Sequence, residues 1–401
     1  MTTHLDKPAS LGGTPVRATF LPVAAPWIGE REKALVLETL ESDWITTGPR
    51  AHELGRRVAE YVGARHGLAL NSCTGALHLA LAAMGVGPEH EVITSAYTFV
   101  ASVNVIEHVG ARPVLVDIDP EIHCLDPAAV AAAVTPRTKA IMPVHYGGHP
   151  CDMDPILTTA RTHGLRVVED AAHALGAADR GRRVGSIGDA TAFSFYAIKN
   201  LTTGEGGAVT TDDDALNERM GILALHGINR DAWKRYAATG SWYYEVTAPG
   251  FKYNLSDILA AVGLGQLERF DAFQARRAQL AARYHALLAD VPEVRRPVAR
   301  PHVTHAWHLY PVALDLERLR CDRATFIEAL RAENIGTTVN FIPIHMHPYF
   351  REHLPYREGA FPRSEDAYRR AVTLPLFPRM TDRDQDDVAA AVRKVVAHYR
   401  V

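Results

Sequence analysis

The sequence contains few cysteines, and none lies in a motif that binds metal. Its 401 residues include Cys73, Cys124, Cys151 and Cys321. No pair has the Cys-x-x-Cys spacing, and none has a histidine at zinc-ligand spacing. Scattered thiols in a chain of this length favour a reducing compartment over a disulfide framework. We therefore expect no metal site.

A strong charge imbalance and a long apolar run are also missing. The chain has 43 Lys and Arg against 46 Asp and Glu, so its formal net charge is −3. This balance gives no electrostatic signature of a nucleic-acid or anionic membrane partner. The most apolar stretch, Ala76 to Val86, is too short to span a membrane, and Met1 to Gly13 lack a signal-peptide pattern. These features predict a soluble, cytoplasmic protein with no nucleic-acid or membrane partner.

Three common catalytic fingerprints are absent as well. No Gly-x-Gly-x-x-Gly follows the first predicted strand, which argues against a dinucleotide site. The sequence also lacks the Gly-x-x-x-x-Gly-Lys-Ser/Thr phosphate loop and the Gly-x-Ser-x-Gly motif of serine hydrolases. The chemistry must therefore be sought at other positions.

Short apolar segments alternate with helical patterns from about residue 57 onward. Continuously apolar strands are typical of a sheet covered on both faces, and their alternation with helices indicates a parallel α/β sheet. The sequence therefore predicts an α/β fold with a mostly parallel seven-stranded sheet. The predicted strands are Gly67–Asn71, Glu91–Ser95, Arg112–Asp117, Ala140–Val144, Leu165–Glu169, Ala190–Phe195 and Gly207–Thr211. The predicted helices are Glu30–Glu41, Gly75–Met84, Phe99–Val109, Pro127–Val134 and Asp154–His163.

The alternation ends near Asn254, where a different pattern begins. We predict a large domain over residues 14–255 and a smaller C-terminal α+β domain over residues 256–401. A segment rich in Pro and Arg, Pro292 to His302, interrupts the helical pattern of the second domain. Its predicted elements are a long helical stretch over Ser256–Leu288, a strand over Trp307–Leu314, a helix over Arg323–Glu333, an extended piece over Gly336–Phe341 and a helix over Asp382–His398.

Two strand ends in the first domain carry residues suited to binding a ligand. Ligands of parallel sheets bind at the carboxyl ends of the strands. The first strand runs through Asn71 to Ala76 into a helix, whose free N–H groups suit a phosphate, although Ser and Thr are also ordinary helix caps. Asp170 ends a buried strand, where a carboxylate is costly unless a cation such as a protonated pyridine faces it. An N-cap role for Asp170 is equally compatible with the local sequence.

Lys199 follows a third strand, directly after an aromatic and apolar stretch. Apolar surroundings lower the pKa of a lysine, as a Schiff-base lysine requires, although most lysines are simply exposed. His173, three residues after Asp170, faces the same site if the turn is helical and is otherwise a structural histidine. Together, the helix start, Asp170 and Lys199 match pyridoxal 5′-phosphate, which needs a phosphate site, a carboxylate for its ring nitrogen and an amine for its aldehyde.

With these residues in view, the chain resembles the DegT/StrS-type nucleotide-sugar aminotransferases, a fold-type I pyridoxal-phosphate family. The resemblance runs from about Pro22 to the C-terminus, and its specificity comes from the joint order of several short segments. They are Asp43–Pro49, Tyr97–Ala101, Pro143–Gly148, Val168–Ala174, Phe193–Phe195 with Lys199–Gly207, and Gly250–Leu255.

The resemblance implies a role for each matched residue. Lys199 forms the aldimine with the cofactor, Asp170 pairs with the pyridinium nitrogen, and His173 lies near the phenolic oxygen. Asn254 reaches the cofactor phosphate of the partner subunit, which implies a homodimer with shared active sites. The remaining cofactor contacts are the aromatic ring of Phe99 and the phosphate ligands Thr74, Gly75 and Ser194. The expected substrate-binding residues are Thr47, His226 and His345.

The reaction that the resemblance implies is ping-pong transamination from L-glutamate to a 4-keto nucleotide sugar, UDP- or dTDP-linked. Several segments are most similar to the enzymes that form UDP-4-amino-4-deoxy-L-arabinose, whereas Trp242–Val246 is more similar to those that make 4-amino-4,6-dideoxy sugars. Two alternatives stay open: a family member acting on a non-nucleotide ketone such as a keto-inositol, and a non-catalytic regulatory protein on the same fold. A related dehydrating enzyme would carry histidine in place of Lys199.

Overall fold

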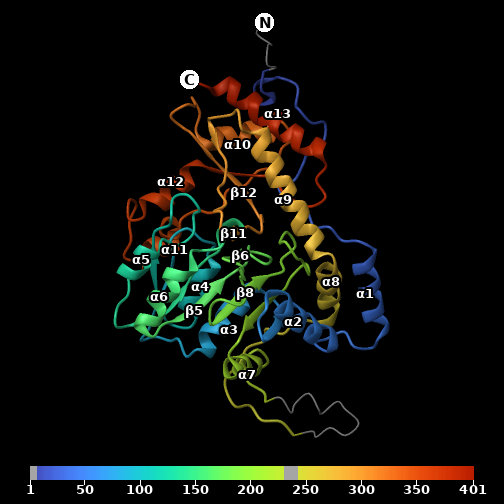
Figure 1. Cartoon of the computed structure of the whole chain (residues 1–401), viewed down its shortest axis with the longest axis vertical. Helices are drawn as coiled ribbons and strands as arrows, with labels where there is room; N and C mark the ends of the chain where they lie inside the picture. Colours follow the sequence, from blue (N-terminus) through green and yellow to red (C-terminus); the bar gives the residue numbers. More distant parts are fainter. Residues whose placement is uncertain (1–6, 230–242) are drawn as a thin grey trace.

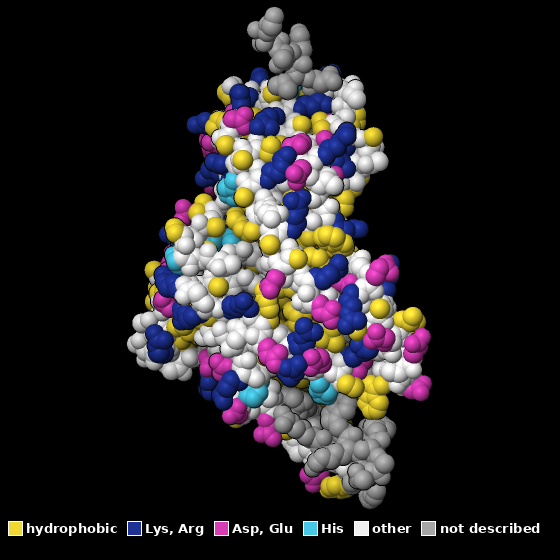
Figure 2. Space-filling model, turned by 45° about the vertical axis from the view of Figure 1, so that its right-hand side comes forward, with side chains coloured by type: hydrophobic (Ala, Val, Ile, Leu, Met, Phe, Trp, Pro, Cys, Tyr) yellow, Lys and Arg dark blue, Asp and Glu magenta, His cyan; other side chains and the backbone are white. Residues whose placement is uncertain are grey.

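The protein is described here by a computed structural model that covers residues 7–229 and 243–401. The molecule is elongated (Figure 1): a large sheet with its helices occupies the lower part, and a smaller α+β part lies above it. The C-terminal end of the chain lies at the top, beside α13. Acidic and basic side chains are interspersed over the face drawn in Figure 2, and hydrophobic side chains interrupt them in the lower part.

The large sheet has seven strands in the order β1-β9-β8-β5-β4-β2-β3. All pairs are parallel except those that β9 makes with β1 and β8. The link from β8 to β9 contains no helix to carry the chain across the sheet, so β9 returns antiparallel. This confirms the predicted sheet. The bounds are His66–Leu70 (β1), Glu91–Ser95 (β2), Arg112–Val116 (β3), Thr138–Met142 (β4), Arg166–Asp170 (β5), Ala190–Ser194 (β8) and Gly207–Thr211 (β9).

Helices cover both faces of this sheet. Two of them, α2 and α7, were not predicted. The segment from Thr46 to Pro49 has the composition of a turn, and the sequence predicts one there, but Pro49 occupies the first position of α2. Gly55 lets α2 lie directly on β1, since a Cβ there would be 2.5 Å from the carbonyl oxygen of Gly67. The helices are Glu30–Glu41 (α1), Pro49–Val62 (α2), Cys73–Ala83 (α3), Ala101–His108 (α4), Pro127–Ala132 (α5), Met153–His163 (α6) and Asp214–Leu223 (α7).

The predicted helical stretch from Ser256 to Leu288 is two helices, α8 (Asp257–Glu268) and α9 (Phe270–Leu287). Arg269 lies between them with a non-helical ψ of 5°. Its guanidinium donates to the carbonyl of Trp27 at 3.0 Å and to the buried carboxylate of Glu32 at 2.7 Å. These tertiary contacts accompany the break, and periodicity alone does not show it.

The smaller part has its own apolar core around the three-stranded sheet β10-β12-β13. Leu21 belongs to this core and pairs with Ile335, so the N-terminal segment packs against the C-terminal part. The domain boundary at residue 255 stays a prediction. The elements are β10 (Val294–Arg295), β12 (Tyr310–Leu314), α10 (Arg323–Ala332), α11 (Pro348–His353), α12 (Pro362–Arg370), β13 (Ala371–Leu374) and α13 (Asp382–Tyr399).

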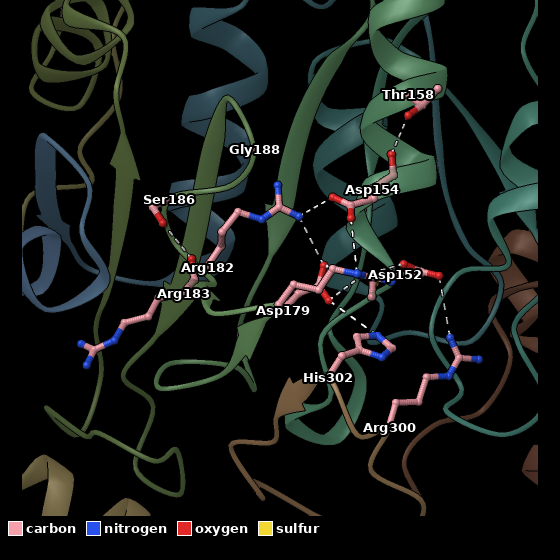
Figure 3. A network of polar contacts seen from close by, with 12 residues as sticks. Asp152, Asp154, Thr158, Asp179, Arg182, Arg183, Ser186, Gly188, Arg300 and His302 are labelled. Carbon is pink, nitrogen blue, oxygen red and sulfur yellow. Dashed lines mark hydrogen bonds and ion pairs between the residues drawn. The ribbon is translucent and has the colours of Figure 1, made fainter.

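A third, small sheet joins the two parts through ion pairs (Figure 3). It consists of β6 (Ala178–Asp179), β7 (Arg182–Arg183) and β11 (Val303–Thr304). The fully buried Asp179 accepts a hydrogen bond from Arg180 at 2.9 Å, and His302 lies 3.7 Å away. This network ties the segment before β11 to the large sheet. Across residues 7–229 and 243–401, we find no helix with the length and apolar character needed to cross a membrane.

Candidate active site

A cavity of about 440 Å³ lies at the carboxyl ends of β5 and β8, facing the smaller part of the molecule. The elements that form its floor, α3, β5 and β8, lie together in the lower part of Figure 1. Six of the residues predicted from the sequence line this cavity: Thr74, Phe99, Asp170, His173, Ser194 and Lys199. Residues from the ends of four strands, β1, β2, β5 and β8, therefore converge as the topology predicts.

Asp170 is held rigidly at the end of β5. Its side chain is 5% exposed, and its Oδ2 accepts a hydrogen bond from the Ser102 hydroxyl at 2.7 Å. Its Oδ1 accepts a hydrogen bond from the backbone N–H of Ala172 at 3.1 Å. The Thr98 hydroxyl lies 2.8 Å from the Ser102 hydroxyl and extends this series of hydrogen bonds. A carboxylate fixed in this way suits a cationic group in the cavity.

Lys199 lies on the loop that connects β8 to β9, where its N–H donates to the Tyr196 carbonyl at 2.9 Å. Burial lowers the pKa of its amine to about 8, although Cys73 and Asp170 act in the opposite direction. An ordinary lysine has a pKa near 10.4. A substantial fraction of this amine is therefore unprotonated near neutral pH, as nucleophilic attack on an aldehyde requires.

This pKa predicts how cofactor addition depends on pH. Below pH 8 the rate at which cofactor-free protein reacts with pyridoxal 5′-phosphate should fall about tenfold per pH unit, because only the free amine attacks. Above pH 8 the rate should level off. Stopped-flow absorbance measures it directly. A rate that keeps rising tenfold per unit to pH 10 would mean that Lys199 has an ordinary pKa.

The N-terminus of α3 forms the polar end of the cavity. Ser72 caps the helix by accepting a hydrogen bond from the Gly75 N–H at 2.9 Å, and Thr74 is exposed at this end. The helix approaches β9 closely, since a Cβ on Gly207 would lie 2.6 Å from the Cys73 nitrogen. Free N–H groups at a helix start attract a phosphate. Together with the Asp170 carboxylate and the Lys199 amine on other walls, these N–H groups fit pyridoxal 5′-phosphate.

His173 forms another wall, packed between two further rings. Its ring lies 5.7 Å from that of Phe341, nearly parallel, and 4.4 Å from that of His308. The N–H of Gly147 donates to its Nδ1 at 3.3 Å. Burial, followed by the charge of Lys199, holds the pKa of His173 well below its usual value. The ring is therefore neutral and carries its proton on Nε2.

The other predicted site residues do not line this cavity. Gly75 lies behind it, where a Cβ would be 3.3 Å from the Tyr253 ring. Asn254 donates to the Thr47 hydroxyl, which in turn donates to the Leu255 carbonyl at 2.5 Å. His226 is exposed on the segment after α7, with a φ of 58°.

His345 was expected in the substrate pocket, and that role stays a prediction. The residue is 1% exposed and does not line the cavity of its own chain. Its Nε2 lies 2.8 Å from Glu365, and its ring packs against Phe361. Within its own chain, His345 is a core residue. Trp242, used to compare subgroups of the family, lies outside the described residues.

Sequence reasoning missed several residues of the cavity. His305 and His308 belong to a histidine-rich strip, His302 to His308, which the sequence leaves open between ordinary surface and ligand binding. His305 is partly buried, and His308 is buried and lines the cavity. Ser102 bonds the key carboxylate although no local motif marks it. Its only signal is its position, four residues after Thr98 on a helix that follows a strand end. Among the described residues, no cluster of His, Cys, Asp and Glu could hold a metal ion.

Comparison with known proteins places the chain in a family. The DegT/DnrJ/EryC1/StrS aminotransferase family matches residues 26–393. The spore coat polysaccharide biosynthesis protein SpsC of Bacillus subtilis is 51% identical over 381 residues, which covers 95% of this chain and 98% of SpsC.

Two solved structures show the same architecture. The putative sugar aminotransferase Spr1654 of Streptococcus pneumoniae, in its PMP form, superposes with a TM-score of 0.89 at 33% identity, covering 94% of this chain and 99% of Spr1654. DesI, solved in the presence of its TDP-sugar product, gives a TM-score of 0.86 at 34% identity, covering 96% and 95% of the two chains.

These similarities confirm the fold class, the enzyme class and the cofactor, pyridoxal 5′-phosphate, that the sequence predicts. The roles of the individual site residues stay predictions. The match spans nearly the whole chain, and it agrees with a cavity that combines Asp170, Lys199 and a helix N-terminus. The chain belongs to the DegT/DnrJ/EryC1/StrS aminotransferase family.

Proposed function

We propose that this enzyme transfers the amino group of L-glutamate to a 4-keto nucleotide sugar, UDP- or dTDP-linked, by ping-pong transamination. The observation that carries the proposal is the convergence of Asp170 and Lys199 on one cavity beside the N-terminus of α3. The relatives support the substrate class, because SpsC takes part in polysaccharide biosynthesis and DesI was solved with a TDP-sugar product.

The residues of the cavity divide the chemistry between them. Pyridoxal 5′-phosphate supplies an electron sink for the carbanion that forms at the amino donor. The carboxylate of Asp170 holds the ring nitrogen in its protonated form, which that sink requires. The Nζ of Lys199 takes the proton from the donor Cα and returns it to the cofactor's C4′ carbon, a general-base and then a general-acid step. In the second half-reaction the keto product of the donor has left, and the keto sugar binds and accepts the amino group.

The remaining walls bind and orient. The N–H groups at the start of α3 and the Ser194 hydroxyl receive the phosphate. Phe99 is 57% exposed in the cavity, and its ring centroid lies 6.0 Å from that of Phe341. Both rings offer apolar surface to a flat ligand. His173, neutral and protonated on Nε2, offers a donor to the cofactor's phenolic oxygen.

A second copy of the chain completes the site in this proposal, so that the working unit is a cytoplasmic homodimer. Asn254 and Thr47 bond each other outside the cavity of their own chain. Several large apolar side chains are exposed in the segments nearby: Trp44, Ile45, Tyr196, Ile198 and Val246. Exposed apolar side chains of this number are typical of a protein–protein interface.

Mixing two inactive variants tests the shared site. We expect Lys199→Ala and Asn254→Ala each to lose activity. When the two variants are mixed in equal amounts, unfolded and refolded together, the mixture should regain roughly a quarter of the wild-type rate. Half of the random dimers are then hybrids, and one of the two sites in each hybrid has both native residues. Mixtures that stay inactive, although each variant refolds alone, would contradict a site shared between subunits.

The visible spectrum of the purified protein tests the proposed function as a whole. L-Glutamate should bleach the band of the bound cofactor, and one member of a panel of UDP-, dTDP- and GDP-linked 4-keto sugars should restore it. Restoration by a keto-inositol alone would replace the nucleotide-sugar assignment. Protein that never develops the band when cofactor is supplied would favour the regulatory alternative.

A further inference from the structure

A second histidine, which the chemistry above does not use, packs against His173. His308 belongs to the segment that leads into β12, is 4% exposed and borders the cavity. Its ring centroid is 4.4 Å from that of His173, with the two planes tilted by 30°. Two buried imidazoles in contact cannot both be protonated without strong repulsion.

The proton on His308 is placed by the residue that follows Lys199. The Nδ2 of Asn200 donates to Gln274 Oε1 at 2.9 Å and to the Ala306 carbonyl at 2.8 Å. Because both of its N–H groups are used, the Oδ1 of Asn200 is the atom that faces His308 Nδ1, at 2.9 Å. His308 therefore carries its proton on Nδ1 and donates it to Asn200.

The charge of the pair is set by its surroundings. Burial, followed by His173, Lys199 and Arg277, holds the pKa of His308 well below its usual value. Burial likewise lowers the pKa of His173 and keeps it neutral, and its Nδ1 accepts a hydrogen bond from the Gly147 N–H. The two rings thus have opposite tautomers, and only His173 keeps an N–H on Nε2 for a ligand.

We propose that His308 is a positioning residue for His173. It packs against the His173 ring and is itself fixed through Asn200 to the Lys199 loop and, through Gln274, to α9. This arrangement holds the His173 ring in place and keeps its Nε2–H aimed at the cofactor's phenolic oxygen. The proposal rests on the proposed function, since it assigns that donor to the bound cofactor.

The test is a pH titration of the visible absorbance of the bound cofactor, with no substrate present. A donor to the phenolic oxygen stabilises its deprotonated form and lowers the pH midpoint of the colour change. His308→Phe keeps an aromatic ring against His173 but loses the hydrogen bond to Asn200. We expect its midpoint to rise by about one pH unit, the size of one such hydrogen bond.

Two further variants make the result decisive. Asn200→Ser removes the acceptor of the His308 hydrogen bond, and we expect it to raise the pH midpoint as well. This variant also tests the proposal if His308→Phe does not fold. His305→Phe is the matched control, because His305 is a partly buried histidine of the same segment that packs on Trp307 and lies outside the cavity lining. Its midpoint should equal that of the wild type.

The outcomes separate this inference from the proposed function. Wild-type protein that shows the cofactor band, with midpoints unchanged in folded His308→Phe or Asn200→Ser, overturns the role of His308 and leaves the function intact. Equal shifts in His305→Phe also overturn it, since the effect would then be general to the segment. Wild-type protein without a cofactor band overturns both.

Discussion

Replacing Lys199 with alanine is expected to abolish transamination, with kcat falling by at least about 10³-fold, because the variant lacks the group that moves the proton between the donor Cα and the cofactor. Steady-state rates with L-glutamate and a keto sugar measure this loss. The same change removes the covalent attachment of the cofactor. Gel filtration should therefore strip pyridoxal 5′-phosphate from the variant and not from the wild type.

A lysine outside the cavity provides the control for this experiment. Lys33 on α1 has a side chain that is 62% exposed and pairs with Glu30, so Lys33→Ala should keep both the rate and the bound cofactor. Added methylamine can partly replace a missing lysine amine, so rescue by a small amine would strengthen the assignment. Normal turnover by Lys199→Ala would refute the role of this residue.

Asp170→Asn is expected to lower kcat by on the order of 10²- to 10³-fold, the loss that follows when one partner of a buried charge pair is removed. The amide has nearly the shape of the carboxylate and keeps its packing beside Ser102, but it cannot hold a positive charge on the cofactor's ring nitrogen. Half-reaction rates with L-glutamate, followed by absorbance, isolate the step concerned. Cofactor should still bind through Lys199.

A graded companion variant checks the cause. Ser102→Ala removes one hydrogen bond to the Asp170 carboxylate and leaves its charge, so we expect a loss of about tenfold. The order wild type, Ser102→Ala, Asp170→Asn should hold for the half-reaction rate. A rate for Asp170→Asn above that of Ser102→Ala would mean that another group serves the ring nitrogen.

Much of this architecture follows from local sequence patterns. The seven strands were predicted because most are short apolar segments that alternate with helical patterns, and β2 and β9 have the predicted bounds. Helix α2 was missed because Pro49 has two uses, in turns and at the first position of a helix, and local sequence does not separate them. The break at Arg269 was missed because the residues it contacts there, Trp27 and Glu32, lie far away in the chain.

The sequence by itself determined the enzyme class and the cofactor. A lysine after an apolar strand, an aspartate at the end of another and a small-residue helix start are each ambiguous alone, but together they match pyridoxal 5′-phosphate, and a parallel sheet brings such strand ends to one edge. Only the tertiary structure decided how these groups are supported. The Ser102 bond to Asp170, the contact of His308 with His173 and the burial of His345 beside Glu365 all join residues distant in sequence. Such contacts depend on how helices and loops pack over the sheet, and no local pattern encodes that packing.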